Sequence, residues 1–120
     1  MNKVREIKFR AWDKEKEEMT EIININLLDE ACRLMQYIGL KDKNGKEIYE
    51  GDIVKRQAYI DYENQSKINK VEGVIEMYNY SWCIVHKNED KRYIHPLFME
   101  EEFCNINELE IIGNIYEGIS

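Results

Sequence analysis

Two histidines and three cysteines are the side chains of this sequence with the widest chemical range. His86 and His95 lie nine residues apart on what should be neighbouring strands, so a cross-strand pair could hold a metal ion. Cys83 is a candidate third ligand, but alternation along a strand places it on the face opposite His86. The sequence therefore predicts no metal site, and both histidines are interpreted as half-buried residues of a sheet.

A polar turn that includes Gly45 invites comparison with the calcium loop of an EF-hand. With Gly45 at the sixth position of such a loop, Asp42 and Asn44 fall at the third and fifth positions. The first position is then Leu40 and the twelfth is Gly51, and neither residue supplies a carboxylate. We therefore expect no calcium site at this turn.

A cysteine nucleophile needs a positioned base and electropositive surroundings. Cys83 lies in an apolar stretch, and Cys104 follows three glutamates and a phenylalanine, so both are interpreted as packing residues. Carboxylate pairs such as Glu50 with Asp52 carry little information in a chain with 24 acidic residues. No phosphate-binding loop, dinucleotide fingerprint or hydrolase motif is present, so the sequence predicts neither an enzyme nor a cofactor.

Length and composition indicate a single domain over residues 1–120, without disulfides. The odd number of cysteines, the missing leader and the lack of a long apolar run predict a reduced, cytoplasmic protein that does not enter a membrane. The net charge is −7, and residues 57–120 hold 12 acidic but only 5 basic side chains. This charge argues against non-specific binding to duplex nucleic acid, and it suits either a basic protein partner or an ordinary acidic surface.

Hydrophobic periodicity and turn residues place most of the chain in strands. Strands are expected at residues 7–13, 19–25, 34–40, 48–49, from 53 onward, and at 71–78, 81–87, 92–98 and 109–116. Asn44 and Gly45 predict a type I′ turn between the two strands of a central hairpin. Asn26 can cap a short helix over residues 27–35, one helical turn is expected at 99–105, and residues 57–70 are expected to form a long excursion or an irregular hairpin.

These elements predict a mainly β (α+β) fold. We expect a small, strongly bent antiparallel sheet or an SH3-like, partly open barrel, with an N-terminal β-hairpin and one or two short helices. Residues 1–33 would supply the N-terminal hairpin and a short helix, and residues 34–120 the central hairpin and a barrel-like core.

Three segments resemble the YopX family, small proteins encoded by bacteriophages and by prophages of Gram-positive bacteria. They are residues 36–54 (QYIGLKDKNGKEIYEGDIV), residues 7–13 (IKFRAWD) and residues 109–117 (LEIIGNIYE), and they occur in the family's order. The resemblance implies no established activity and assigns no role to any residue.

Two functions of different kinds follow as expectations. The first is a non-enzymatic accessory protein that binds a host or phage protein in the bacterial cytoplasm, through residues that the sequence does not identify. The alternative is a nucleic-acid-associated factor that uses basic and aromatic residues of the N-terminal strand and of the later barrel, namely Arg5, Lys8, Arg10, Trp12, Lys55 and Arg56. Core packing is the favoured interpretation of Trp12, because a small domain needs large side chains to fill its core. Open sheet edges predict a homo-oligomer.

Overall fold

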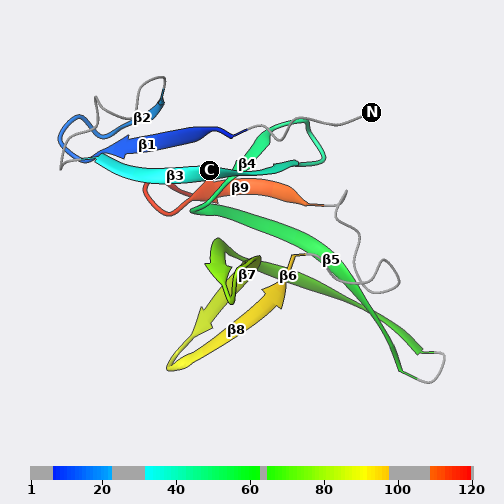
Figure 1. Ribbon diagram of the computed structural model, residues 1–120. Coiled ribbons are helices and arrows are strands. Elements are labelled where there is room, and N and C mark those ends of the chain that lie inside the picture. Colours follow the sequence, from blue (N-terminus) through cyan, green and yellow to red (C-terminus); the bar gives the residue numbers. More distant parts are fainter. Residues whose placement is uncertain (1–6, 23–31, 63–64, 98–108, 120) are drawn as a thin grey trace.

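The computed structural model describes residues 7–22, 32–62, 65–97 and 109–119, and every element among them is a strand (Figure 1). The first sheet has the order β2-β1-β3-β4, from β1 (Phe9–Asp13), β2 (Glu18–Glu21), β3 (Cys32–Lys41) and β4 (Glu47–Tyr49). The second has the order β10-β9-β5-β6-β7-β8, from β5 (Asp52–Tyr62), β6 (Gln65–Tyr78), β7 (Ser81–Asn88), β8 (Lys91–Pro96), β9 (Glu110–Asn114) and β10 (Gly118–Ile119).

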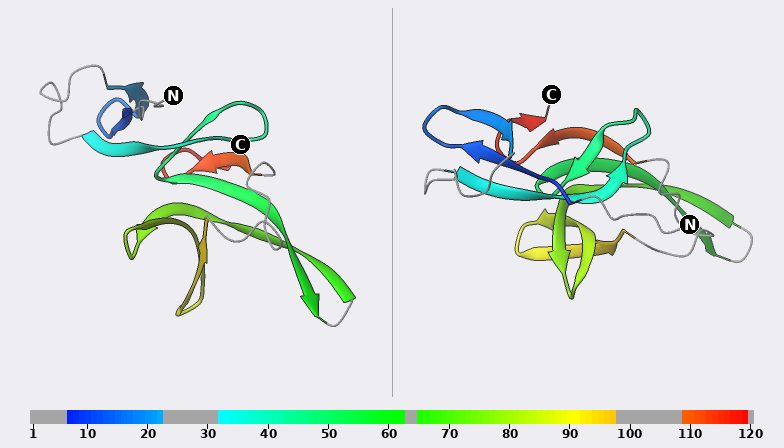
Figure 2. Two further views of the ribbon diagram at one scale, coloured as in Figure 1. Left: turned by 45° about the vertical axis from the view of Figure 1, so that its right-hand side comes forward. Right: turned by 45° about the horizontal axis from the view of Figure 1, so that its top comes forward.

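All strand pairs are antiparallel, and the second sheet curls strongly into a half-barrel (Figure 2). The mainly β fold and the bent sheet are therefore confirmed. The core contains aliphatic side chains and one tryptophan from both sheets, together with Leu97 and Leu109: Ile38, Ile48, Val54, Val71, Ile75, Trp82, Ile84, Leu97 and Leu109.

The predicted helix over residues 27–35 is wrong at its carboxyl-terminal end. Residues 32–35 begin strand β3, in which Leu34 pairs with Ala11 and Met35 with Arg10. An isolated helix of two or three turns is marginal in water, and pairing with β1 instead satisfies the same backbone groups over five consecutive residues. Residues 23–31 and the turn predicted at 99–105 lie outside the described residues, as does the end of the strand predicted at 19–25.

The central hairpin is confirmed, but its turn is not of type I′. Asn44 has no positive φ, whereas Gly45 has a φ of 84°. The Asp42 side chain accepts hydrogen bonds from the N–H groups of Asn44 and Lys46, and these bonds set the shape of the loop. The hydrogen bonds of the buried Asp42 side chain thus set the conformation of this loop, in place of the type I′ turn that the Asn-Gly pair prefers.

Residues 57–62 and 65–70 form neither an excursion nor an irregular hairpin. Strands β5 and β6 pair without interruption from Ile53 opposite Val74 to Tyr62 opposite Gln65, as a long two-stranded arm (Figure 1). Continuous backbone pairing outweighs the weak alternation of polar residues in this stretch. The meander of β6, β7 and β8 and the position of Pro96 at the end of an edge strand are confirmed.

Candidate functional site

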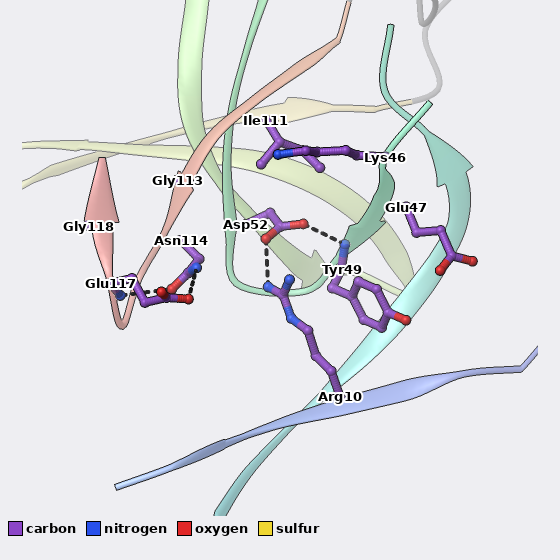
Figure 3. Close-up of a pocket in the computed structure, with 10 residues that line it drawn as sticks. All are labelled: Arg10, Lys46, Glu47, Tyr49, Asp52, Ile111, Gly113, Asn114, Glu117 and Gly118. Atoms are coloured by element: carbon purple, nitrogen blue, oxygen red, sulfur yellow. Dashed lines mark hydrogen bonds and ion pairs between the residues drawn. The ribbon is translucent and has the colours of Figure 1, made fainter. Parts of the chain in front are cut away.

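Asp52 lies where the two sheets meet. Strand β4 ends at Tyr49, the chain turns through Gly51 at a φ of 87°, and β5 begins at Asp52. The Asp52 carboxylate is 1% exposed and accepts the Tyr49 N–H at 2.8 Å through Oδ2. Its Oδ1 accepts a hydrogen bond from Nη2 of Arg10 on β1 at 2.6 Å (Figure 3). One carboxylate therefore joins the first strand of the chain to the turn between the sheets.

The Arg10 guanidinium is held on three sides. Besides its bond to Asp52 it lies over the Tyr49 ring, with 4.7 Å between the guanidinium carbon and the ring centroid, and Nη2 lies 3.7 Å from the Met35 sulfur. Burial raises the pKa of Asp52 above its usual value, although the Tyr49 N–H and Arg10 act in the opposite direction. The pair is thus a desolvated ion pair, whose role in the fold depends on both partners.

Asp42 makes a second connection between the sheets. Its Oδ1 accepts the two N–H groups of its own loop, and its Oδ2 accepts the Ile111 N–H of β9 at 3.1 Å. The neighbouring Lys43 N–H donates to the Leu109 carbonyl at 2.8 Å. Burial alone would raise the pKa of Asp42. The hydrogen bonds from three backbone N–H groups, of which Ile111 acts most strongly, lower the pKa by more, so its net shift is downward.

A pocket of about 520 Å³ opens beside this junction (Figure 3). It is lined by residues from β1, the β3–β4 loop, β4, the start of β5 and the β9–β10 hairpin: Arg10, Lys46, Glu47, Tyr49, Asp52, Ile111, Gly113, Asn114, Glu117 and Gly118. Most of its polar side chains bond to the protein itself. Asn114 Oδ1 accepts two backbone N–H groups of its turn, and its Nδ2 donates to Glu117 at 3.0 Å.

The two carboxylates at this junction accept hydrogen bonds that hold the sheets together. Both oxygens of Asp52 already accept hydrogen bonds, and so do both oxygens of Asp42. The pocket's lining contains no Ser, Thr, Cys or His that could act as a nucleophile beside a base. The arrangement therefore fixes the two sheets relative to each other and presents a polar recess whose lining also includes Lys46, Glu47, Tyr49 and Glu117.

The two histidines singled out as metal ligands lie on neighbouring strands but lack a third ligand among the described residues. Within the described ranges, no group of three His, Cys, Asp or Glu side chains could hold a metal ion. His86 is exposed opposite Tyr93, and His95 is half-buried opposite Ile84. Burial lowers the pKa of His95, and Arg56 and His86 lower it further. The prediction of half-buried histidines thus holds for His95 alone.

Cys83 follows the packing interpretation. Cys83 is 3% exposed, its Sγ lies 3.6 Å from the Ser81 carbonyl oxygen, and burial raises the pKa of its thiol. A raised pKa disfavours the thiolate that a nucleophile requires. Cys104 lies outside the described residues.

The basic and aromatic residues of the nucleic-acid hypothesis have partners within the protein. Arg10 binds Asp52, Trp12 stacks on Tyr116 with 5.5 Å between ring centroids, and Arg56 is 3% exposed and donates to the carbonyls of Pro96 and Leu97. Lys8 pairs with Glu47, and Lys55 with Glu110, at 2.7 and 3.1 Å. Arg5 lies outside the described residues. Positive charge in the sequence therefore does not become a positive surface at Arg10 or Arg56.

Sequence reasoning missed the turn between β6 and β7 as a feature of interest. The strands predicted at residues 71–78 and 81–87 leave Asn79 and Tyr80 between them, but no role was given to these two residues. In the folded chain the Tyr80 side chain is fully exposed, at 101%. The sequence could have drawn attention to Tyr80, because a bulky aromatic residue is unusual in a two-residue hairpin loop.

This combination defines a small β protein in which a curled half-barrel sheet is joined to a second sheet through buried carboxylates. Residues 24–118 match the family described as YopX protein, and the chain belongs to the YopX family. No curated protein matches. The chain is also similar to the crystal structure of protein EF1440 from Enterococcus faecalis, at 23% identity and a TM-score of 0.48, over 95% of this chain and 96% of that one. None of the described segments forms a helix of the length and apolar character that a membrane crossing requires.

The Asp52 carboxylate gives a first prediction. Asp52→Ala leaves the largely buried Arg10 guanidinium and the Tyr49 N–H without their acceptor, so we expect the free energy of unfolding to fall by about 3–5 kcal/mol in a urea titration. The control is Glu47→Gln, which weakens the half-exposed pair with Lys8 and should cost less than about 1 kcal/mol. Equal losses in the two variants would contradict the assignment.

The Asp42 carboxylate gives a pH dependence. Because its pKa in the folded protein lies below the ordinary value of 3.8, its stabilisation is complete above that pH and is lost as the pH falls through the lowered value. The difference in unfolding free energy between the wild type and Asp42→Asn should therefore shrink on acidification from about pH 6 to about pH 2.5. Urea titrations along this series measure it, and a difference that stays constant or widens would refute the prediction.

Proposed function

We propose that this protein is a non-enzymatic accessory protein, encoded by a phage or prophage, that binds a host or phage protein in the bacterial cytoplasm. One observation supports the proposal most: apolar and aromatic side chains are exposed on the β6–β7 turn, the neighbouring strands and the β9–β10 hairpin. They include Met77, Tyr78, Tyr80, Tyr93, Ile115 and Ile119, each between 42% and 101% exposed. Tyrosine in particular is enriched at protein interfaces and at their energetic centres.

The non-enzymatic part of the proposal is supported by the junction pocket. The residues that line it include no Ser, Thr, Cys or His, and its buried carboxylate holds Arg10 and a backbone N–H through its two oxygens. Membership of the YopX family supports the phage or prophage origin, since such genomes are where the sequence resemblance places the family. The curled half-barrel is also compatible with an SH3-like barrel, a fold that often serves in binding.

The nucleic-acid alternative is less well supported. The net charge of −7 opposes binding to phosphate, and the Arg10 and Arg56 side chains are largely buried against acceptors within the protein. A protein whose affinity came from phosphate contacts would need several exposed cations along one face. We keep this alternative as one outcome of the experiment below.

Affinity capture tests the proposal. The tagged full-length chain is incubated with a Gram-positive bacterial lysate, with and without nuclease, and the retained proteins are identified by mass spectrometry. We expect at least one protein to be retained at equal yield under both conditions. Proteins that are lost only after nuclease treatment would favour the nucleic-acid alternative, and no specific retention in either arm would contradict protein binding.

We further propose that the chain forms a homo-oligomer through a sheet edge. Strands β2, β4, β8 and β10 are the edges of the two sheets, as far as the chain is described, and open edges tend to be covered by a second copy. Light scattering of the purified chain at several concentrations measures this directly. A mass above that of the 14.5 kDa monomer is expected, and a monomer at every concentration would refute it.

A further inference from the structure

The pocket beside the sheet junction has walls that come from distant parts of the chain (Figure 3). Lys46 lies in the β3–β4 loop and Glu47 begins β4, whereas Glu117 lies on the turn between β9 and β10. The Asp42 side chain binds N–H groups of its own loop and an N–H of β9. The loop and the hairpin are therefore held in place relative to each other, and the pocket between them is formed before any ligand arrives.

Five charged side chains line this pocket, and three of them are paired within the protein. Arg10 forms an ion pair with Asp52, with 2.6 Å between Nη2 and Oδ1. Glu47 forms an ion pair with Lys8 of the first strand segment, at 2.7 Å. These pairs compensate one another's charge, so they leave little net field in the pocket.

Lys46 and Glu117 are the two charged lining residues that remain uncompensated. Neither forms an ion pair with any residue that the structure describes, although Lys46 lies near enough to Asp42 to help lower the pKa of that carboxyl group. The Glu117 carboxylate accepts a hydrogen bond from Nδ2 of Asn114 at 3.0 Å, which is a neutral donor. One ammonium group and one carboxylate are therefore available to a ligand, from different walls of the same pocket.

The Arg10 guanidinium also has donors to spare. Its Nη2 donates to Asp52, but its Nε is buried and has no hydrogen-bond partner among the described residues. A guanidinium offers several N–H donors, and a buried donor without an acceptor costs free energy. A second carboxylate beside Arg10 would be stabilised by this charge and by the donors that Asp52 leaves unused. The anionic end of a ligand thus belongs on the side of Arg10.

We propose that the pocket binds a small zwitterion of the amino-acid type. The ligand carboxylate lies near Arg10 and Lys46, and its ammonium group lies near the Glu117 carboxylate. A volume of about 520 Å³ is ample for such a molecule, and Ile111 in the lining offers apolar surface to its carbon chain. This site goes beyond the proposed function and does not depend on it.

Ligands with a single charge fit this pocket less well. An anion alone would leave Glu117 unpaired and would bring a like charge toward the Asp52 carboxylate, while a cation alone would meet Arg10 and Lys46. An uncharged ligand would leave both Lys46 and Glu117 without a partner. A molecule that carries both charges satisfies the two walls at once.

A titration of the isotopically labelled full-length chain, followed by its amide NMR signals, tests the site. The probes are two zwitterions, glycine and γ-aminobutyrate, which differ in the separation of their charges, and two single-charge analogues, butyrate and butylamine. At least one zwitterion should shift the amide signals of Lys46, Ile111 and Glu117 and saturate them at a concentration at least about ten-fold below either analogue. The same zwitterion should raise the Tm by a few degrees, because it binds only the folded chain.

Two variants assign the ends of the ligand. Lys46→Met should weaken binding of the zwitterion and of butyrate by about three- to ten-fold but leave butylamine unaffected. Glu117→Gln keeps an acceptor for Asn114, and it should weaken the zwitterion and butylamine by a similar factor without weakening butyrate. The matched controls are Lys14→Met and Glu15→Gln, which change exposed charges in the β1–β2 loop outside the pocket and should leave all affinities unchanged.

The remaining outcomes contradict the proposal. If neither zwitterion shifts these amides, the pocket is not such a site, and the proposed protein binding, which the capture experiment measures separately, is unaffected. Butyrate that binds as tightly as the zwitterions shows an anion site instead. Equal losses in the control variants show that the overall charge of the chain, and not these two side chains, governs binding.

Discussion

The fold depends on a carboxylate that is buried where one sheet ends and the other begins. Asp52 follows the turn at Gly51, and its two oxygens bind Arg10 from the first strand and the Tyr49 N–H from the fourth. Asp42 and the bond from the Lys43 N–H to the Leu109 carbonyl add further directional links between the sheets, whereas the apolar packing between them is not directional. Hydrogen bonds to a buried ion pair fix direction as well as distance, so the Asp52 side chain helps to determine how the N-terminal sheet is set against the half-barrel.

The same bonds fix the positions of both carboxylates. Asp52 and Asp42 are each held by backbone N–H groups from different parts of the chain. The pocket lies beside this fixed junction. The exposed aromatic groups lie elsewhere, on the β6–β7 turn, and there the chain accepts backbone strain that glycine would remove.

Local patterns predicted most of the strands because strands and turns are encoded by neighbouring residues. The meander from β6 to β8 and the central hairpin follow from alternation and turn residues alone. The carboxyl-terminal end of the helix predicted over residues 27–35 and the type I′ turn at Asn44 failed for another reason. In each case a partner distant in the chain, β1 for the strand and β9 for the Asp42 loop, adds bonds that local propensity does not contain.

The candidate site could not be predicted for the same reason. Arg10 and Asp52 are 42 residues apart, and Asp42 and Ile111 are 69 residues apart, so no spacing within the sequence marks either pair. The basic residues of the first strand indicated a charged surface, and only the fold reveals that Arg10 turns inward. Tyr80 was visible in the sequence, but its backbone angle and its full exposure were not.

Native-state hydrogen exchange of single amides tests most directly whether buried carboxylates join the sheets. The Tyr49 N–H and the Ile111 N–H donate to Asp52 and Asp42 instead of to a neighbouring strand. If the carboxylates hold the junction, both amides should exchange only on global unfolding, as slowly as the amide of Ile84 in the centre of the half-barrel. Fast exchange of Tyr49 and Ile111, with Ile84 still protected, would show that the junction opens on its own and would contradict the account.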